Sequence, residues 1–188
     1  MQFIDFLTLM LINMSAGLVV LAWYVLKGMD DPDQPKWAPA FAVPGLIALL
    51  NGLRIAWLWP LPGSYNVAFG DLSVLFGILF LGAAWSLHTK RDLMPLAVYA
   101  FFAGLASMLV GVAAIVMGMT KYPILSGAGF LLTGGAGVFA GVALYLRKNM
   151  AVRVIGALVL LAAAAIWAFN GYAGYWGHLS MFSKWMPK

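Results

Sequence analysis

The sequence predicts an all-α fold: a polytopic membrane bundle of six transmembrane helices, built as three two-helix hairpin repeats. Three observations lead to this fold class. Of the 188 residues, 64% are hydrophobic and 9% are charged, whereas an ordinary globular protein carries about 25% charged residues. Six apolar runs are long enough to cross a bilayer, and glycines that begin similar segments recur every 60 residues. We therefore expect one transmembrane domain over residues 1–188.

Six segments reach the roughly 20 apolar residues that a transmembrane helix needs. They lie at about 4–27, 38–59, 70–88, 93–118, 124–146 and 151–176. Connection 28–37 holds three aspartates and two prolines, which is typical of a turn in water. The first residues lack the positively charged region of a signal peptide, so we expect the first run to remain as a span.

A repeat organises the chain. Gly17, Gly77 and Gly137 each begin an apolar stretch that runs into a basic turn. In residues 76–105, two apolar runs meet at the charged turn TKRD, which predicts a helical hairpin for a bilayer. The repeats are expected at about 4–60, 70–118 and 124–176, related by an axis along the membrane normal. The alternative is chance similarity among helices rich in Gly, Ala and Leu.

The positive charges predict the orientation. If spans one, three and five end in the cytoplasm, that side holds Lys27, Lys36, Lys90, Arg91, Arg147, Lys148 and Arg153. The opposite side holds Arg54, Lys121, Lys184 and Lys188. Because Lys and Arg are enriched in cytoplasmic loops, we expect both termini outside. The net charge of +5 comes from few residues and does not indicate nucleic-acid binding.

Composition also limits the chemistry. Cysteine is absent, which excludes disulfides, thiolate metal sites and a cysteine nucleophile, and all acidic side chains are aspartates. No nucleotide-binding loop, nucleophile elbow or zinc motif occurs. His88 and His178 are expected at opposite ends of the bundle, so one chain cannot place both on one haem. We predict no metal and no cofactor beyond lipid contacts, with a haem or quinone at a subunit interface left open.

Polar residues inside a membrane protein are costly, which makes them functional candidates. In the expected topology they gather near the outer end of the bundle. The candidate binding residues are Arg54, Asp71, Asn51, Asp5, Asn170 and Tyr65. Asn51 lies three residues before Arg54, hence on the same helix face. We interpret the set as an outward-facing polar vestibule with Arg54 and Asp71 as its ion pair.

Each candidate also has a structural interpretation. Arg54 could extend to the outer headgroups with its apolar stem in the membrane. Asp71 could be the N-cap of the third span, because it opens that helix. Asn51 and Asn170 could hold helices together by hydrogen bonds.

The opening stretch FIDFLTLMLINMSAGLVVLAWYVLKG resembles a family of small prokaryotic six-span membrane proteins of unknown function. That likeness extends over most of the chain and implies a prokaryotic cytoplasmic membrane. In layout alone, three hairpins with both termini outside, the chain also resembles the urea/amide channel family. This second resemblance implies ring-shaped oligomers that conduct small neutral solutes. The chain has no glutamate and that family's channel motifs find no place on it, so no site residue carries over.

These observations favour a small-solute channel or facilitator that forms a homo-oligomer. The alternative is a membrane anchor or accessory subunit of a larger, redox-active membrane complex, because the many aromatic and methionine residues suit lipid, quinone or partner surfaces. An enzyme is not expected, because neither paired carboxylates nor a histidine cluster falls on one side of the membrane.

Overall fold

The computed structural model describes residues 6–181 and 183. This part of the chain is all-helical, and five of its helices are long and apolar enough to cross a membrane. They span Leu7–Gly28, Gln34–Leu58, Asn66–His88, Met94–Val116 and Met150–Met181. The predicted class, an all-α membrane protein, is confirmed at this level.

The helices follow the apolar runs of the sequence to within a few residues. The first half of the chain contains α1 (Phe6–Trp23) with the π-helical turn η1 (Tyr24–Gly28), the 3₁₀ turn η2 (Gln34–Trp37) before α2 (Ala38–Leu58), and the π-helical turn η3 (Asn66–Asp71) before α3 (Leu72–His88). The second half contains α4 (Met94–Val116), α5 (Pro123–Val138), α6 (Ala140–Tyr145) and α7 (Met150–Met181).

The fifth predicted span, 124–146, is interrupted. It forms α5 with 16 residues and α6 with 6 residues, and the break falls at Phe139. At 1.5 Å per residue, α5 is about 24 Å long, shorter than the roughly 30 Å hydrocarbon core. Glycines at 134, 135, 137 and 141 surround the break, and each of them weakens a helix relative to alanine.

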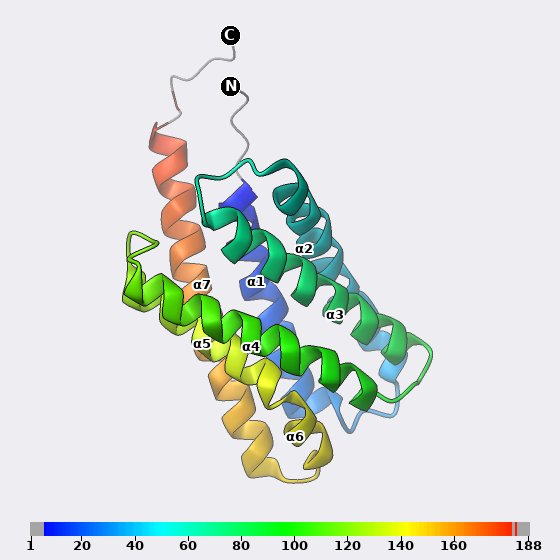
Figure 1. The fold of residues 1–188 in the computed structure, drawn as a ribbon. Coiled ribbons are helices and arrows are strands. Elements are labelled where there is room, and N and C mark those ends of the chain that lie inside the picture. The colour runs from blue at the N-terminus through cyan, green and yellow to red at the C-terminus, as the bar shows by residue number, and fades with distance from the viewer. Residues whose placement is uncertain (1–5, 182, 184–188) are drawn as a thin grey trace.

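Six helices of the described chain form a closed ring. Each of α1 to α5 packs against the next helix along the chain, α5 packs against α7, and α7 packs against α1. Figure 1 shows α1 and α7 side by side, with the start of α1 and the end of α7 at the same end of the molecule. The short helix α6 packs on α4 at the other end.

Three antiparallel pairs within this ring are packed most closely: α2 with α3, α4 with α5, and α1 with α7. In the α4–α5 pair, a Cβ added to Gly104 would lie 2.5 Å from the Gly134 carbonyl oxygen. In the α2–α3 pair, a Cβ added to Gly77 would lie 2.6 Å from the Leu49 backbone nitrogen. Only glycine allows the backbones to approach so closely.

Small residues seven positions apart line these contacts. In α1 and α7 they are Thr8, Ser15 and Ala22, and Ala157, Ala164 and Gly171. In α2 and α3 they are Ala38, Gly45 and Gly52, and Gly77 and Ala84, with Gly70 in η3. In α4 and α5 they are Ala97, Gly104 and Gly111, and Gly127 and Gly134. Seven residues make about two helical turns, so each set lies on one helix face.

The close pairs differ from the predicted hairpins. Hairpins at 4–60, 70–118 and 124–176 would join α1 with α2, α3 with α4, and α5 with α7, and these helices do touch. The tightest contacts, however, are shifted by one helix, so the repeat is not confirmed in its predicted form. The reason is that small residues on both facing surfaces decide which helices approach most closely.

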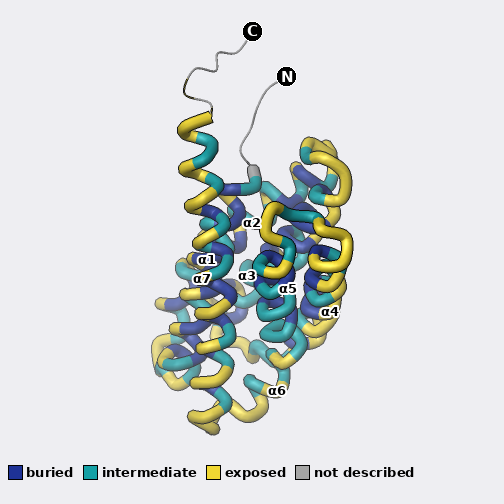
Figure 2. Tube along the Cα trace, turned by 90° about the vertical axis from the view of Figure 1, so that its left-hand side faces the viewer, coloured by how far each residue is buried: buried dark blue, intermediate teal, exposed yellow. Residues whose placement is uncertain are grey.

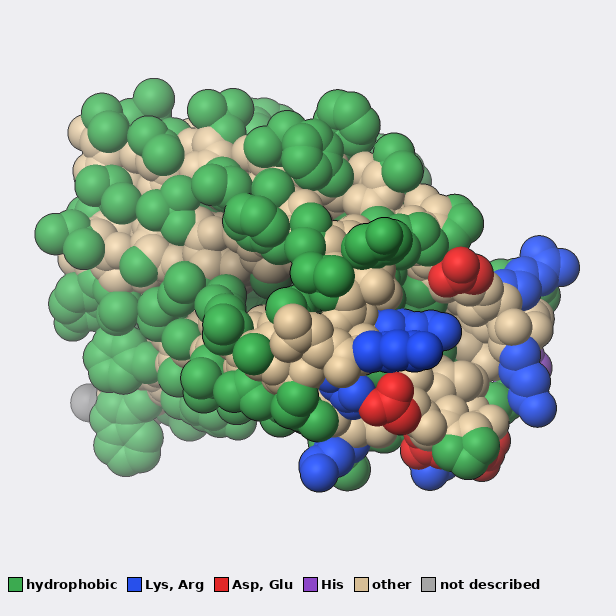
Figure 3. All heavy atoms as spheres, turned by 90° about the horizontal axis from the view of Figure 1, so that it is seen from below, with side chains coloured by type: hydrophobic (Ala, Val, Ile, Leu, Met, Phe, Trp, Pro, Cys, Tyr) green, Lys and Arg blue, Asp and Glu red, His purple; other side chains and the backbone are tan. Residues whose placement is uncertain are grey.

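The two ends of the ring differ in composition. We call the end that holds connections 28–37, 89–93 and 146–149 the charged end, and the opposite end, where α1 begins and α7 ends, the terminal end. Seen from below, Lys, Arg and Asp side chains gather on one part of the surface, and hydrophobic side chains cover most of the rest (Figure 3). Along the helices, the exposed positions lie mainly on the outer faces (Figure 2). This exposed apolar surface is what a lipid-facing bundle requires.

Candidate functional site

Arg54 and Asp71, the expected ion pair of the vestibule, lie at the terminal end. A Cβ added to Gly52 would lie 2.9 Å from the Gly70 carbonyl oxygen, so the end of α2 packs against η3. Both candidate residues follow closely on these glycines and are exposed. The structure therefore places them at one end of one helix pair, and their pairing stays a prediction.

The two candidate asparagines bond within their own helices. Asn51 Nδ2 donates to the Ile47 carbonyl oxygen at 3.1 Å, and Asn170 Nδ2 donates to the Ile166 carbonyl oxygen at 3.0 Å. Both residues are half-buried. These amide donors join neither two helices nor the other candidate residues.

The remaining candidates are Tyr65, Asp5 and, as a helix cap, Asp71. Tyr65 is half-buried and stacks on Phe69 with ring centroids 5.9 Å apart. Asp5 lies outside the described residues. Asp71 has helical dihedral angles (φ −64°, ψ −43°) and, within the described chain, makes no side-chain capping bond. The capping interpretation is therefore wrong, because η3 already extends α3 by more than a turn before Asp71.

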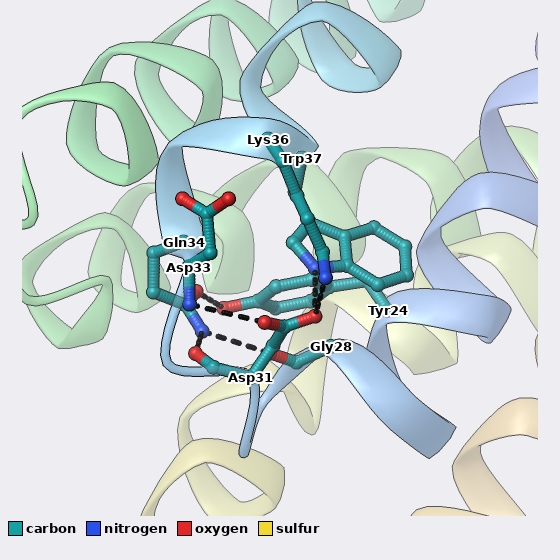
Figure 4. Close-up of polar contacts among 7 residues, drawn as sticks. All are labelled: Tyr24, Gly28, Asp31, Asp33, Gln34, Lys36 and Trp37. Atoms are coloured by element: carbon teal, nitrogen blue, oxygen red, sulfur yellow. Dashed lines mark hydrogen bonds and ion pairs between the residues drawn. The ribbon is translucent and has the colours of Figure 1, made fainter.

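The charged end has a polar network that sequence reasoning missed (Figure 4). Asp31 is its centre. Its carboxylate accepts from the Asp33 backbone N–H at 3.0 Å and from Trp37 Nε1 at 3.2 Å, and it pairs with Lys36 Nζ at 2.5 Å. These donors, Lys36 foremost, hold the pKa of the Asp31 carboxyl below its usual 3.8.

Gln34 joins this network to the end of α1. Its Nε2 donates to the Gly28 carbonyl oxygen at 2.8 Å and to the Asp31 carbonyl oxygen at 2.6 Å. Its Oε1 accepts from the Tyr24 hydroxyl at 2.8 Å. Figure 4 shows these side chains converging inside the 28–37 connection. The network closes the turn between α1 and α2.

Arg153 ties α7 to the same turn. Its side chain is only 4% exposed. Nε donates to the Val25 carbonyl oxygen at 2.7 Å and Nη2 to the Leu26 carbonyl oxygen at 2.6 Å, while Nη1 pairs with Asp30. The last carbonyls of a helix lack intrahelical donors, so the guanidinium supplies donors to the end of α1. In the sequence, Arg153 counted only as a cation near a loop.

The described residues hold no group of three or more His, Asp, Glu or Cys side chains that could bind a metal ion. His88 is exposed at the last residue of α3, and His178 lies near the end of α7. The two histidines therefore lie at opposite ends of the ring.

Between the two ends, a partly open cavity of about 50 Å³ is lined by residues of α1, α2, α3 and α5. Most of its wall is apolar and includes Met14, Leu72, Phe76 and Phe80. None of the described residues that line it carries a formal charge. The cavity is therefore a candidate site for an uncharged molecule.

Three polar side chains interrupt this apolar wall: Asn13 on α1, Ser73 on α3 and Thr133 on α5. Asn13 Nδ2 donates to the Pro44 carbonyl oxygen at 2.9 Å, which joins α1 to α2. The Ser73 hydroxyl is 4.0 Å from the Met10 sulfur, at the limit of a hydrogen bond. These contacts hold the polar groups in place beside the cavity.

Thr133 belongs to a longer chain of contacts. Its hydroxyl donates to the Gly129 carbonyl oxygen at 2.8 Å and accepts from Trp167 Nε1 at 3.0 Å. The Trp167 ring contacts Phe130 at 4.8 Å between centroids, and Phe130 contacts Phe69 at 5.4 Å. Phe69 and Phe130 come about one helical turn before Ser73 and Thr133. An aromatic cluster therefore lies on the terminal-end side of the cavity.

The sequence contains a signal for the cavity residues that its interpretation did not use. Asn13, Ser73 and Thr133 are not among the candidate binding residues chosen from the sequence. The three lie 60 residues apart, each four residues before one of the repeat glycines Gly17, Gly77 and Gly137. The periodicity that predicted the repeat also marks these positions.

Comparison with known families gives one match. A family model described as "Protein of unknown function (DUF981)" matches residues 1–181. None of the curated proteins and none of the solved structures matches the chain. The comparisons therefore give no link to the urea/amide channels.

Proposed function

Because this chain belongs to the DUF981 family, whose function is unknown, and has helices apolar enough to cross a membrane, we propose a function from the geometry alone. The protein is a facilitator that lets a small uncharged solute cross the membrane through its helix ring. The observation that carries this proposal is the cavity between the two ends, with polar side chains in an otherwise apolar wall. Small-molecule sites commonly combine an apolar lining with a few placed polar groups.

The proposal includes six crossings, with α5 and α6 together as the fifth. Residues 123–145 cover about 34 Å at 1.5 Å per residue, enough for the hydrocarbon core. Two contacts support this path. A Cβ added to Gly141 on α6 would lie 3.4 Å from Ala97 Cβ near the start of α4. Arg153, in the first turn of α7, donates to the Val25 and Leu26 carbonyl oxygens in η1.

The charged end is proposed to face the cytoplasm of a prokaryotic cell, which places both termini outside. The connections at that end hold Lys36, Lys90, Arg91, Arg147 and Lys148. At the terminal end, the described residues include Arg54 and Lys121. This distribution is the one the positive-inside rule favours.

We also expect copies of the chain to associate in the membrane. Gly135 and Gly177 lie where no atom of the described chain comes within 4 Å of an added Cβ. Uncovered glycines allow a helix of a neighbouring copy to approach closely. The mass of the protein solubilised in a mild detergent measures this association.

The function is tested by solute flux in liposomes. Vesicles with purified protein are exposed to gradients of water, ammonia, formamide, urea and glycerol, and the flux is followed by light scattering or an internal pH dye. We expect at least one of these solutes to cross at least about tenfold faster than in protein-free vesicles. Equal rates for every solute would contradict a facilitator. Recovery of the chain in a complex with other polypeptides would then favour the anchor alternative.

A further inference from the structure

The three polar residues of the cavity wall occupy equivalent positions in the chain. Asn13, Ser73 and Thr133 are 60 residues apart and lie on α1, α3 and α5. These helices run in the same direction, because each is antiparallel to its close partner and the chain alternates between the two ends of the ring. Equivalent residues on three like-directed helices that line one cavity define a threefold pseudo-axis through it.

From this arrangement, and resting on the proposed function, we propose that the solute passes along the pseudo-axis of a single chain and that Asn13, Ser73 and Thr133 form its polar constriction. Asn13 is the specificity residue of that constriction. The solute is a small uncharged molecule that carries both a hydrogen-bond donor and an acceptor, such as a simple amide.

The hydrogen-bond capacity of the three residues singles out Asn13. Thr133 already donates to Gly129 and accepts from Trp167. Asn13 uses one N–H on the Pro44 carbonyl oxygen, and its Oδ1 and second N–H have no other partner in the described chain. An amide has two donors and an acceptor with two lone pairs. Asn13 can therefore both accept from and donate to a solute in the cavity.

Size and charge limit the solute. A water molecule needs about 10–15 Å³ of cavity volume, so the cavity of about 50 Å³ holds about four waters or one solute with a similar number of non-hydrogen atoms. An ion would lose its hydration without meeting an opposite charge, because none of the described lining residues is charged. Formamide and urea fit these limits, and glycerol exceeds them.

The test compares matched variants in the liposome assay. Asn13→Leu keeps a similar volume and removes the amide. Its control is Asn149→Leu, because Asn149 is exposed in connection 146–149 at the charged end and does not line the cavity. We expect Asn13→Leu to lower formamide and urea flux about tenfold, since a site built for a polar group loses much when the group is removed. Asn149→Leu should stay within about twofold of wild type. The thermal midpoint in detergent identifies any variant that fails to fold.

A second pair of variants covers the case in which loss of the Asn13–Pro44 bond unfolds the protein. Ser73→Ala removes one hydroxyl without adding bulk. Its control is Ser86→Ala, because Ser86 is a buried serine on the same helix that does not line the cavity. We expect Ser73→Ala to lower formamide flux about threefold and Ser86→Ala to leave it unchanged. Folded Asn13→Leu or Ser73→Ala variants with flux equal to that of their controls would overturn the polar constriction.

Mixed reconstitution separates a single-chain route from one between subunits. With equal amounts of wild type and Asn13→Leu, a route inside each chain predicts about half of the wild-type flux. A route between two subunits predicts about a quarter, because both partners must be wild type, and that result would overturn the inference. If the wild type conducts solute and neither Asn13→Leu nor Ser73→Ala lowers the flux, the inference fails and the proposed function stands. If the wild type conducts no solute, the proposed function fails as well.

Discussion

The charged end and the terminal end of the ring use polar residues differently. At the charged end, Arg153 is buried and bonded to the end of α1, and Asp31 receives several donors. At the terminal end, Arg54 and Asp71 are exposed, and Asn51 bonds its own helix. The charged end therefore joins α1, α2 and α7 through side chains. At the terminal end, the side-chain bonds of Asn51 and Asn66 stay within one helix and one connection.

The largest effect is expected from Arg153→Ala. The substitution leaves the buried Val25 carbonyl and the partly buried Leu26 carbonyl without their donors, whereas Asp30 is 66% exposed and keeps its hydration. Each buried unsatisfied carbonyl costs about 1–3 kcal/mol, so we expect a loss of about 3 kcal/mol in the free energy of unfolding. Thermal or denaturant unfolding in detergent measures it.

The control at the other end is Arg54→Ala. Because the Arg54 side chain is exposed, its removal should cost less than about 1 kcal/mol. Arg153→Lys should fall between the two, because an ammonium keeps the charge but lacks the planar fork that reaches two carbonyls and a carboxylate. Equal losses of unfolding free energy for Arg153→Ala and Arg54→Ala would contradict the claim that the two ends use their polar residues differently.

A second effect tests the close pairs that connect the two ends. In Gly104→Ala the new Cβ would lie 2.5 Å from the Gly134 carbonyl oxygen and 2.6 Å from the Val138 backbone nitrogen. Backbone cannot move aside as a flexible side chain can, so we expect a loss of about 2 kcal/mol. In the control Gly156→Ala, the nearest atom to the new Cβ is Val25 Cγ1 at 3.9 Å, an ordinary van der Waals contact. It should be neutral or slightly stabilising in the same unfolding measurement.

A smaller effect is expected at the terminal end from Asn66→Ala. Asn66 is fully buried, and its side chain accepts from the Leu61 backbone N–H and donates to the Leu61 and Gly63 carbonyl oxygens. Water can reach the exposed Gly63 once the amide is gone, so we expect a loss of about 1 kcal/mol. Asn51→Ala should cost less, and a larger loss for Asn51→Ala would contradict the stabilising role of the Asn66 side-chain bonds in the connection between α2 and η3.

The apolar helices could be predicted from the sequence because they follow from hydropathy. Five of the six apolar runs became helices long enough to cross a membrane, and the interrupted fifth run became α5 and α6 over residues 123–145. The close pairing was not predictable in the same way. Lipid and the ring interior are both apolar, so the pattern of hydrophobic residues does not reveal which face of a membrane helix points inward. The small residues spaced by seven carry that information.

The site was harder to predict for a related reason. Arg54 and Asp71 stand out in an apolar sequence, but they lie on the exposed surface. Serine and threonine are common in membrane helices, so Ser73 and Thr133 are not unusual by themselves. They become candidates only because they lie 60 residues apart in a series with Asn13. In the sequence, nothing distinguishes Arg153 from other cations that lie near a loop. Its role depends on the fold, which brings α7 beside the end of α1.

The smallest effect concerns acid stability at the charged end. The pKa of Asp31 is lowered in the folded protein, chiefly by Lys36. A lowered pKa contributes stability above the unfolded value, and this contribution is lost as the pH falls through the folded value. We expect wild type to lose stability below about pH 4, and Asp31→Asn to lose less over that window. Thermal midpoints at pH 3 to 6 for both proteins measure the difference, and parallel curves would contradict the assignment.

The central claim is that the two ends lie on opposite sides of the membrane, with α5 and α6 completing a crossing between them. The chain has no cysteine, so single variants report the side directly with a membrane-impermeant maleimide on intact bacterial cells. We predict that Ser64→Cys and Lys121→Cys react in intact cells, and that Thr89→Cys and Asn149→Cys react only after the membrane is opened. Labelling of Asn149→Cys in intact cells while Thr89→Cys stays protected would contradict the six-crossing ring.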